Sequence, residues 1–312
     1  MGPTLAIAFG AGLASALLFA TLASGSAIAL VLFYFAALPV LIAGLGWGHY
    51  AGAFAGTIGA LALSIAMRSQ LGVFFFLSVG LPAWILSYLT VATLPARSDD
   101  DQPYRWSEPG TILSVIGLGA VLLTLFGIVV LFGFDFDAYQ ASLRQSVDRA
   151  LAAMALPASD GQRMLGAFMA VALPIAAAII WTFVTTLNLY VAAKIVRASG
   201  RLPRPWPDLA SLRLPKAAAG AMLFGSLLSF LSGMPGHVGV IVLSVGLAIF
   251  ALAGFALAHD MTRGWGMRGF ALGLLYALTF VIGWPMIFVA MAGLADTLFD
   301  LRSRRSAPPP SL

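Results

Sequence analysis

Long apolar stretches, separated by short polar turns, run through almost the whole chain. The hydrocarbon core of a membrane is about 30 Å thick and requires about 20 apolar residues per helix. The pattern therefore predicts an all-α polytopic transmembrane bundle of about 8–10 spans, which forms a single integral membrane domain over residues 1–300. The expected spans are residues 3–22, 27–46, 49–67, 71–94, 111–134, 164–196, 217–231, 238–257 and 269–294.

Two of these spans contain interruptions. Pro39 lies inside the second span and should kink it, because proline donates no backbone hydrogen bond. The last apolar stretch is broken at residues 283–285. A continuous helix from Arg268 to Arg302 would measure about 51 Å, which is too long for one crossing and too short for two full crossings. Arginines lie both before this stretch, at residues 263 and 268, and after it, at residues 302, 304 and 305. The positive-inside rule favours both groups on the cytoplasmic side. We therefore expect two short helices that turn near residue 285, with the arginine-rich end inside. One tilted span with the tail outside is the alternative.

Small residues recur at every fourth position of the third expected span, and a similar stripe of small residues lies along the first span. Such positions lie on one face of a helix, and small side chains let membrane helices approach closely. The third span is therefore expected at the centre of the bundle. The expected helix-packing residues are Ala8, Gly12, Ala16 and Ala20 in the first span, and Gly48, Gly52, Gly56 and Ala60 in the third.

Residues 135–156 follow a different pattern. Apolar residues such as Leu143 and Val147 recur at helical spacing, whereas Arg144 and Asp148 occupy other faces. This segment is amphipathic and too polar to span the membrane, so it is expected to lie along the external surface of the same membrane. No second element is expected to cover its apolar stripe.

Composition strengthens the membrane interpretation. Of 312 residues, 61% are hydrophobic and 9% are charged, and the mean hydropathy is +0.97. Soluble domains carry about 25% charged residues. The chain contains no cysteine, which excludes disulfides, thiolate metal sites and cysteine nucleophiles. The N-terminus lacks the basic region of a signal peptide and is interpreted as a retained first span. Residues 301–312 are expected to be a disordered tail.

One loop carries the positive charge. The net charge is +5, and residues 194–216 hold six basic residues and one acidic residue. The positive-inside rule explains a short basic loop beside spans better than nucleic-acid binding does. The loop and the N-terminus are therefore expected on the cytoplasmic side of a bacterial inner membrane. Alternating prolines should keep residues 197–216 extended. Its candidate partner-docking residues are Arg197, Arg201, Arg204, Trp206 and Arg213.

Motifs of common catalytic sites are missing from the sequence. It contains no GxxxxGK[ST] phosphate loop, no HExxH motif and no GxSxG elbow. The glycines of residues 44–48 are better explained by helix packing than by a dinucleotide site, and the aspartates of residues 99–101 by a solvated loop. His49, His237 and His259 fall at the ends of different spans. The expected span centres lack Asp, Glu, Lys and Arg, which argues against a proton antiporter or an intramembrane aspartyl protease. We expect no enzyme activity, metal or cofactor.

Two uncharged polar faces remain as candidates for lining a ligand pocket. Interhelical hydrogen bonding is the simpler explanation for such faces. The candidate ligand-binding residues are Trp84 and Tyr88 in the fourth span, and Trp181, Thr185 and Asn188 in the sixth.

Three stretches resemble a known family. They are the glycine-rich helix after LPVLIAG, the segment PDLASLRLP and the closing GLADTLFDLR. Together they resemble the YybS-like family, bacterial multi-span membrane proteins of unknown function. The first four spans also resemble the S components of energy-coupling-factor vitamin transporters, which dock on a transmembrane partner through a small-residue stripe in the first span. Here Ala8, Gly12, Ala16 and Ala20 match that stripe.

Two functions follow as hypotheses. The resemblance to S components implies a non-enzymatic protein that binds or passes a small solute, with energy supplied by a partner. The alternative is a scaffold or assembly factor that docks a cytoplasmic partner through residues 197–216. A pocket between the polar faces would favour transport, and faces sealed against each other would favour the scaffold. The expected partners are the lipid bilayer and a membrane or cytoplasmic protein, with no nucleic acid.

Overall fold

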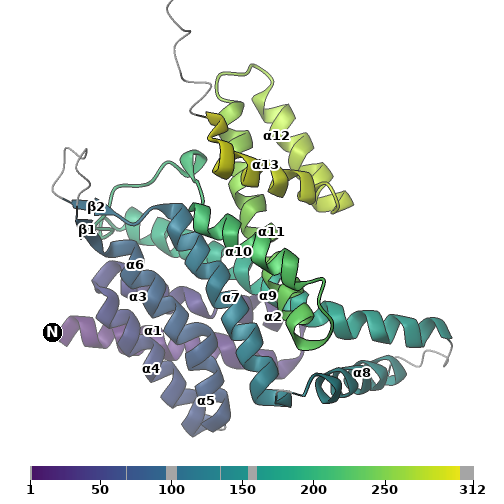
Figure 1. Cartoon of the computed structure of the whole chain (residues 1–312). Coiled ribbons are helices and arrows are strands. Elements are labelled where there is room, and N and C mark those ends of the chain that lie inside the picture. Colours follow the sequence, from purple (N-terminus) through teal and green to yellow (C-terminus); the bar gives the residue numbers. More distant parts are fainter. Residues whose placement is uncertain (1, 68, 96–103, 134, 154–159, 303–312) are drawn as a thin grey trace, which may run out of the picture. The chain divides into compact units, whose positions relative to one another are not determined.

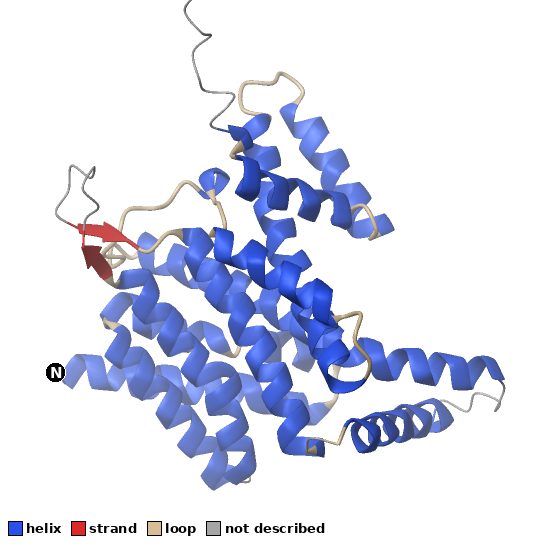
Figure 2. Cartoon of the chain, in the orientation of Figure 1, coloured by secondary structure: helices blue, strands red, loops and turns tan. Residues whose placement is uncertain are grey.

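The computed structural model describes residues 2–67, 69–95, 104–133, 135–153 and 160–302, and this part of the chain is almost entirely helical (Figures 1 and 2). The prediction of an all-α polytopic bundle is confirmed. Seven segments of the described residues are long and apolar enough to cross a membrane: Gly2–Ser24, Ala27–Trp47, His49–Ala66, Ser69–Val91, Pro109–Val130, Met164–Ala198 and Gly233–Met261. Three further helices of the described residues are apolar but shorter, with 10–17 residues: Lys216–Leu228, Arg268–Ile282 and Met286–Phe299. The aspartates of residues 99–101 and the tail from residue 303 lie outside the described residues.

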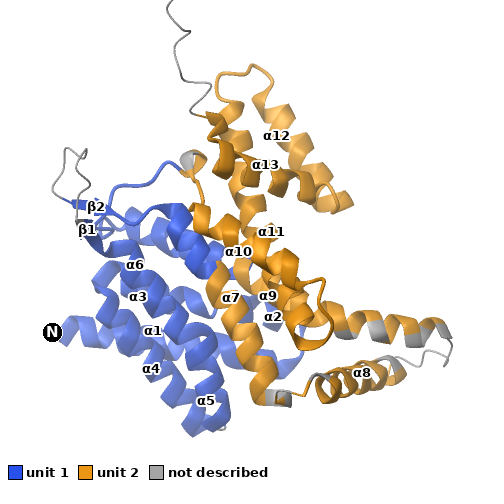
Figure 3. Cartoon of the chain, viewed as in Figure 1, with its two compact units in different colours: residues 1–116, 183–208 blue, residues 117–182, 209–312 orange. Residues whose placement is uncertain are grey.

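The chain divides into two compact units (Figure 3). Unit 1 comprises residues 1–116 and 183–208, and unit 2 comprises residues 117–182 and 209–312. The sequence predicted a single integral membrane domain over residues 1–300, because apolar spans run through almost the whole chain.

Unit 1 contains the first four spans and a small hairpin. β1 and β2 pair antiparallel, with Thr93 opposite Trp106. The elements are α1 (Gly2–Ala20), η1 (Thr21–Ser24), α2 (Ala27–Tyr34), α3 (Ala37–Trp47), α4 (His49–Ala66), α5 (Ser69–Phe75), the π-helical η2 (Phe76–Gly80), α6 (Leu81–Val91), β1 (Thr93–Pro95) and β2 (Tyr104–Trp106).

Pro39 has the effect expected of it. It cannot donate to the carbonyl of Phe35, so the second span breaks into α2 and α3 at Phe35 and Ala36. The Phe35 carbonyl instead accepts a tighter bond from the Leu38 N–H at 3.0 Å. In the fourth span, η2 widens the helix just before Pro82, which likewise lacks a donor.

Helix α4 lies at the centre of unit 1, against α1, α3, α5, η2 and α6. A Cβ added to Gly52 would lie 3.1 Å from the Cα of Gly44 on α3, so these backbones touch. The carbonyl oxygen of half-buried Ala60 faces Gly72 of α5. Gly48 departs from the predicted stripe, because it is exposed, has φ +95° and precedes α4 as its cap, with no atom near its Cα hydrogens.

The small stripe of α1 faces α4. Ala8 and Ala16 are buried, and a Cβ on Gly12 would meet the carbonyl oxygen of Ala55 and lie 3.1 Å from the nitrogen of Gly59. The stripe that resembles the S-component docking surface therefore packs inside unit 1.

Unit 2 is built on one long buried helix, α11. The elements that lie wholly or mainly in unit 2 are α7 (Pro109–Phe132), α8 (Phe136–Ala153), α9 (Asp160–Ala198, which continues into unit 1), η3 (Leu209–Ser211), α10 (Lys216–Leu228), α11 (Gly233–Met261), α12 (Arg268–Ala277), the π-helical η4 (Leu278–Ile282) and α13 (Met286–Phe299).

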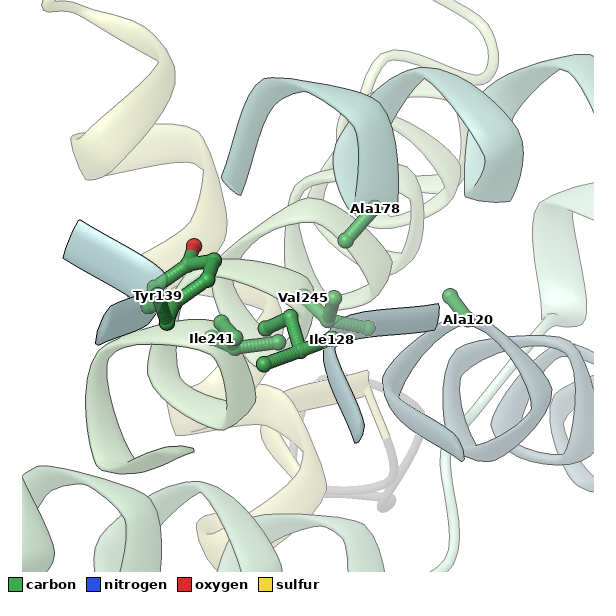
Figure 4. Close-up of a cluster of buried hydrophobic side chains, with 6 residues drawn as sticks. All are labelled: Ala120, Ile128, Tyr139, Ala178, Ile241 and Val245. Atoms are coloured by element: carbon green, nitrogen blue, oxygen red, sulfur yellow. The ribbon is translucent and has the colours of Figure 1, made fainter. Parts of the chain in front are cut away.

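Small residues again permit the closest contacts in unit 2. A Cβ on Gly246 of α11 would lie 2.9 Å from the Cγ of Met222 on α10, and one on Gly293 of α13 would lie 2.6 Å from the nitrogen of Gly254 on α11. Figure 4 shows the adjoining core, with residues from α7, α8, α9 and α11. Its buried members are Ala120, Ile128, Tyr139, Ala178, Ile241 and Val245.

Helix α8 is covered by protein, contrary to the expectation that no second element lies over its apolar stripe. Tyr139 and Val147 are buried, whereas Arg144 is exposed. A Cβ on Gly166 of α9 would lie 3.9 Å from the Cγ1 of Val147, so the start of α9 packs against α8. The expectation was wrong because the pairing of α8 with the start of α9 is a tertiary contact, which the spacing of apolar residues within α8 does not reveal.

The last apolar stretch is broken. Gly283 has φ +84°, which ends the helix of α12 and η4, and a new helix begins at Met286. In Figure 1, α12 and α13 form a hairpin, and the start of α12 lies on the same side of it as the end of α13.

Candidate functional site

The predicted pocket residues have separate packing roles. Trp84 of α6 donates its indole N–H to Nδ1 of His49 at 3.3 Å, and the ring of Tyr88 meets the same histidine edge to face at 5.0 Å. Trp181 belongs to unit 2, where its ring covers Gly119 of α7. Trp84 and Tyr88 thus share one partner, and Trp181 has another.

Asn188 ties α9 to the broken second span. Its Nδ2 donates to the carbonyl oxygens of Tyr34 and Val184, both at 2.8 Å. Because the helix breaks after Tyr34, that carbonyl lacks its ordinary helical partner, and Asn188 satisfies it. Thr185 is buried one turn earlier on α9. The amide oxygen of Asn188 is buried without a hydrogen-bond partner among the described residues.

The three histidines do not converge. His49 contacts Trp84, as described above. The ring of His237 makes a hydrogen bond of 3.1 Å with the hydroxyl of buried Tyr139, and the ring of His259 makes one of 2.9 Å with the hydroxyl of Tyr276. Each histidine thus orients an aromatic side chain.

The part of the basic loop that belongs to unit 1, residues 199–208, is held against the rest of that unit by Arg204. One of its terminal nitrogens (Nη1) donates to the carbonyl oxygens of Thr90 and Ser107, each at 3.2 Å. Its guanidinium carbon lies 5.9 Å from the ring centre of Trp106 on β2. Burial lowers the pKa of Arg204 from its ordinary value. We call β1, β2 and residues 199–208 the hairpin–loop platform; Arg204 joins its parts.

Two further arginines of the loop stack on tryptophans. The guanidinium of Arg197 lies 5.1 Å from the ring centre of Trp206, and that of Arg201 lies 4.6 Å from the ring centre of Trp47. Trp206 also meets Tyr190 edge to face at 5.7 Å. The sequence predicted Arg201 and Arg204 as docking residues but not their contacts with Trp47 and Trp106, which lie far away along the chain. The available signal was the position of Trp47 at the end of a span, where tryptophan is a common interfacial anchor.

Arg213, a further predicted docking residue, belongs to an ion-pair cluster in unit 2. It pairs with Asp300 at 3.1 Å and with Asp296 at 4.0 Å. Asp296 also pairs with Arg302 at 3.0 Å, and Arg302 donates to the carbonyl oxygens of Ala210 and Leu212. Burial is the main cause that lowers the pKa of Arg302. The missed signal was the acidic pair one turn apart near the end of the last apolar stretch.

Comparison with known protein families gives a match over most of the chain. A family described as "Predicted membrane protein (DUF2232)" matches residues 12–297, nearly the whole chain. No curated protein and no solved structure matches the chain. The match supports a multi-span membrane family and includes neither the YybS-like name nor the likeness to S components.

Proposed function

Since the chain belongs to the predicted membrane protein family (DUF2232), we propose that it is a non-enzymatic membrane scaffold. It docks a cytoplasmic protein through the hairpin–loop platform. The observation that carries this proposal is the contact of Arg204 with Thr90 and Ser107, which holds segments about a hundred residues apart in one ordered surface.

The order of the platform indicates a function, because it costs free energy. Fixing the backbone of a loop costs roughly 1–2 kcal/mol per residue, and burying a cation adds a desolvation cost. A loop that only links two spans requires neither an ordered backbone nor a buried cation. Tyr104 and Pro205 on this platform are exposed, so they offer a surface that is already in its bound shape.

The arrangement of the polar faces supports the scaffold over the solute binder. Trp84, Tyr88 and Asn188 are engaged by neighbouring helices, as described above. The α1 stripe, which S components use to dock, packs against α4. We place the platform on the cytoplasmic side of a bacterial inner membrane because the positive-inside rule favours that side for the basic loop.

Site-specific crosslinking tests the scaffold. A photoreactive amino acid at Tyr104 or at Pro205 should capture the same protein in intact membranes, and the Arg204→Ala substitution should abolish both products. Position 144 on α8, which is exposed and far along the chain from the platform, is the matched control and should give no such product. Different products at the two platform positions, or the same product at position 144, would reject the proposal.

A solute-binding role is the second candidate, because the amide oxygen of Asn188 is buried without a partner among the described residues. A bound donor group would satisfy it. Native mass spectrometry of the purified protein with a panel of vitamins and lipid precursors tests this role, with Asn188→Leu as the comparison. Absence of any bound compound and of any thermal shift in the wild type would exclude it.

A further inference from the structure

Arg197 and Arg201 occupy positions that the end of α9 fixes. Gly200 has φ +71°, and its N–H donates to the carbonyl of Arg197 at 2.9 Å. The N–H of Arg201 donates to the carbonyl of Val196 at 3.1 Å. These two bonds form the Schellman arrangement that closes a helix C-terminus. Both side chains therefore leave a rigid helix end, and no bound partner is needed to place them.

Each of the two guanidinium groups is backed by an indole ring. Their carbons lie 5.1 Å from the ring centre of Trp206 and 4.6 Å from that of Trp47. A stacked guanidinium uses its face and keeps the N–H donors in its plane available. Both arginines are exposed, and across the described ranges no carboxylate lies within 4.0 Å of either. The guanidinium groups of Arg197 and Arg201 are thus ordered, and no carboxylate of the described residues neutralises their charge.

The location of these side chains indicates what neutralises them. Trp47 is the last residue of α3, and Arg197 lies in the last turn of α9, so both mark the ends of apolar spans. Lys194 adds a third cation, 5.0 Å above the ring of Tyr190. Tryptophan and tyrosine concentrate where lipid headgroups meet the hydrocarbon, and planar guanidinium groups bind phosphate through two parallel hydrogen bonds.

We propose that Arg197 and Arg201, each backed by a tryptophan, bind the phosphate of an anionic phospholipid headgroup. This site shares Arg201 and Trp206 with the platform but goes beyond the scaffold proposed above, because its ligand is a lipid and it uses neither Arg204 nor the two strands. The lipid would be held at the rim of unit 1, where three cations lie within eight residues of α9 and its cap.

Lipid competition on the purified full-length chain tests the proposal. The protein is mixed with equal amounts of phosphatidylglycerol and phosphatidylcholine, and native mass spectrometry measures the ratio of the two lipids that stay bound. The wild type should prefer phosphatidylglycerol. The double substitution Arg197→Gln/Arg201→Gln should reduce that preference about thirty-fold, as expected for the loss of two basic residues near a membrane surface.

Two control variants make the outcome decisive. Arg144→Gln/Arg149→Gln removes two exposed arginines from α8 and should leave the preference unchanged. Arg197→Lys/Arg201→Lys keeps the charge but removes the planar fork, so it should lose part of the preference; this pair decides the matter if the glutamine variant does not fold. Equal binding of both lipids by the wild type, or an unchanged preference in the lysine and glutamine variants, overturns the proposal. Displacement of the lipid by millimolar inorganic phosphate would also overturn it, since the ligand would then be a soluble anion.

Discussion

Gly56 of α4 and Gly80 of η2 meet backbone to backbone: a Cβ built on Gly56 would lie 2.9 Å from the Cα of Gly80. In lipid, such close approach is a main source of helix packing energy. The π-helical turn of η2 brings Gly80 to this position, next to Pro82. The contact therefore depends on two glycines and on the local widening of one helix.

Substitution of Gly56 should destabilise unit 1. Gly56→Leu would force two backbones apart, and we expect a loss of folded protein, with a cost of roughly 1–3 kcal/mol or more. Gly56→Ala should already lower the melting temperature, because the obstructing atoms are backbone. Gly10→Leu is the matched control, since a Cβ there meets no atom within 4 Å. Equal accumulation and melting of both leucine variants would show that the contact does not hold the fold.

Asp296 should be far more important for stability than Asp300. The Asp296 side chain is 2% exposed and pairs with Arg302, so Asp296→Asn would leave a buried cation without its partner. Such a loss costs roughly 3–5 kcal/mol. The Asp300 side chain is 52% exposed, and Asp300→Asn should cost less than about 1 kcal/mol. Thermal unfolding in detergent measures both; a similar effect of the two substitutions would contradict the burial argument.

Sequence patterns located most elements because lipid imposes simple rules on length and hydropathy. The positions of the spans, the breaks at Pro39 and before Pro285, and the amphipathic α8 all follow from such local rules. The central role of α4 in unit 1 followed from its spacing of small residues.

The sequence did not reveal which side chains meet. Gly239, Gly246 and Gly254 recur every seven or eight residues on α11, and this signal of a second central helix was overlooked. Asn188 was predicted to line a ligand pocket, but its amide donates to the Tyr34 carbonyl at the break between α2 and α3. Recognising this role needs the tertiary pairing of α9 with α2. The partners of Arg201 and Arg204 likewise lie far away along the chain.

Tyr139 should make stability depend on alkaline pH. Burial raises the pKa of its hydroxyl to about 12, from an ordinary value of 10.0. The folded state therefore keeps a proton that the unfolded state loses above about pH 10. Its contribution is complete below pH 10 and declines as the pH rises towards 12, by roughly 2–3 kcal/mol in total. Melting between pH 9 and 12 should show this decline in the wild type, and Tyr139→Phe should lack this component.

Cysteine labelling should report the covered face of α8. The chain has no cysteine of its own. Val147→Cys should resist aqueous thiol reagents in membranes and also in detergent, because protein covers it, and half-buried Leu143→Cys should react slowly. Arg144→Cys is exposed and should react rapidly. Equal labelling at all three positions would show that α8 does not pack against its neighbours as described.

The end of the chain should lie on the same side of the membrane as the basic loop. Arg302 donates to the carbonyl oxygens of Ala210 and Leu212, which places the end of α13 beside the segment that leads into α10. At 1.5 Å per residue, α12 with η4 and α13 are each about 21–23 Å long. Each is therefore shorter than the hydrocarbon core, and the hairpin would enter the membrane and return at Gly283.

If the basic loop is cytoplasmic, a green fluorescent protein fused to the C-terminus should be bright and an alkaline phosphatase fused there should be inactive. A fusion after Gly133, which follows α7 and should lie outside, is the control with the opposite pattern. An active phosphatase with a dark fluorescent fusion at the C-terminus would mean that the last stretch crosses once. The contact of Arg302 with the loop could not then exist, because the two groups would be separated by the membrane.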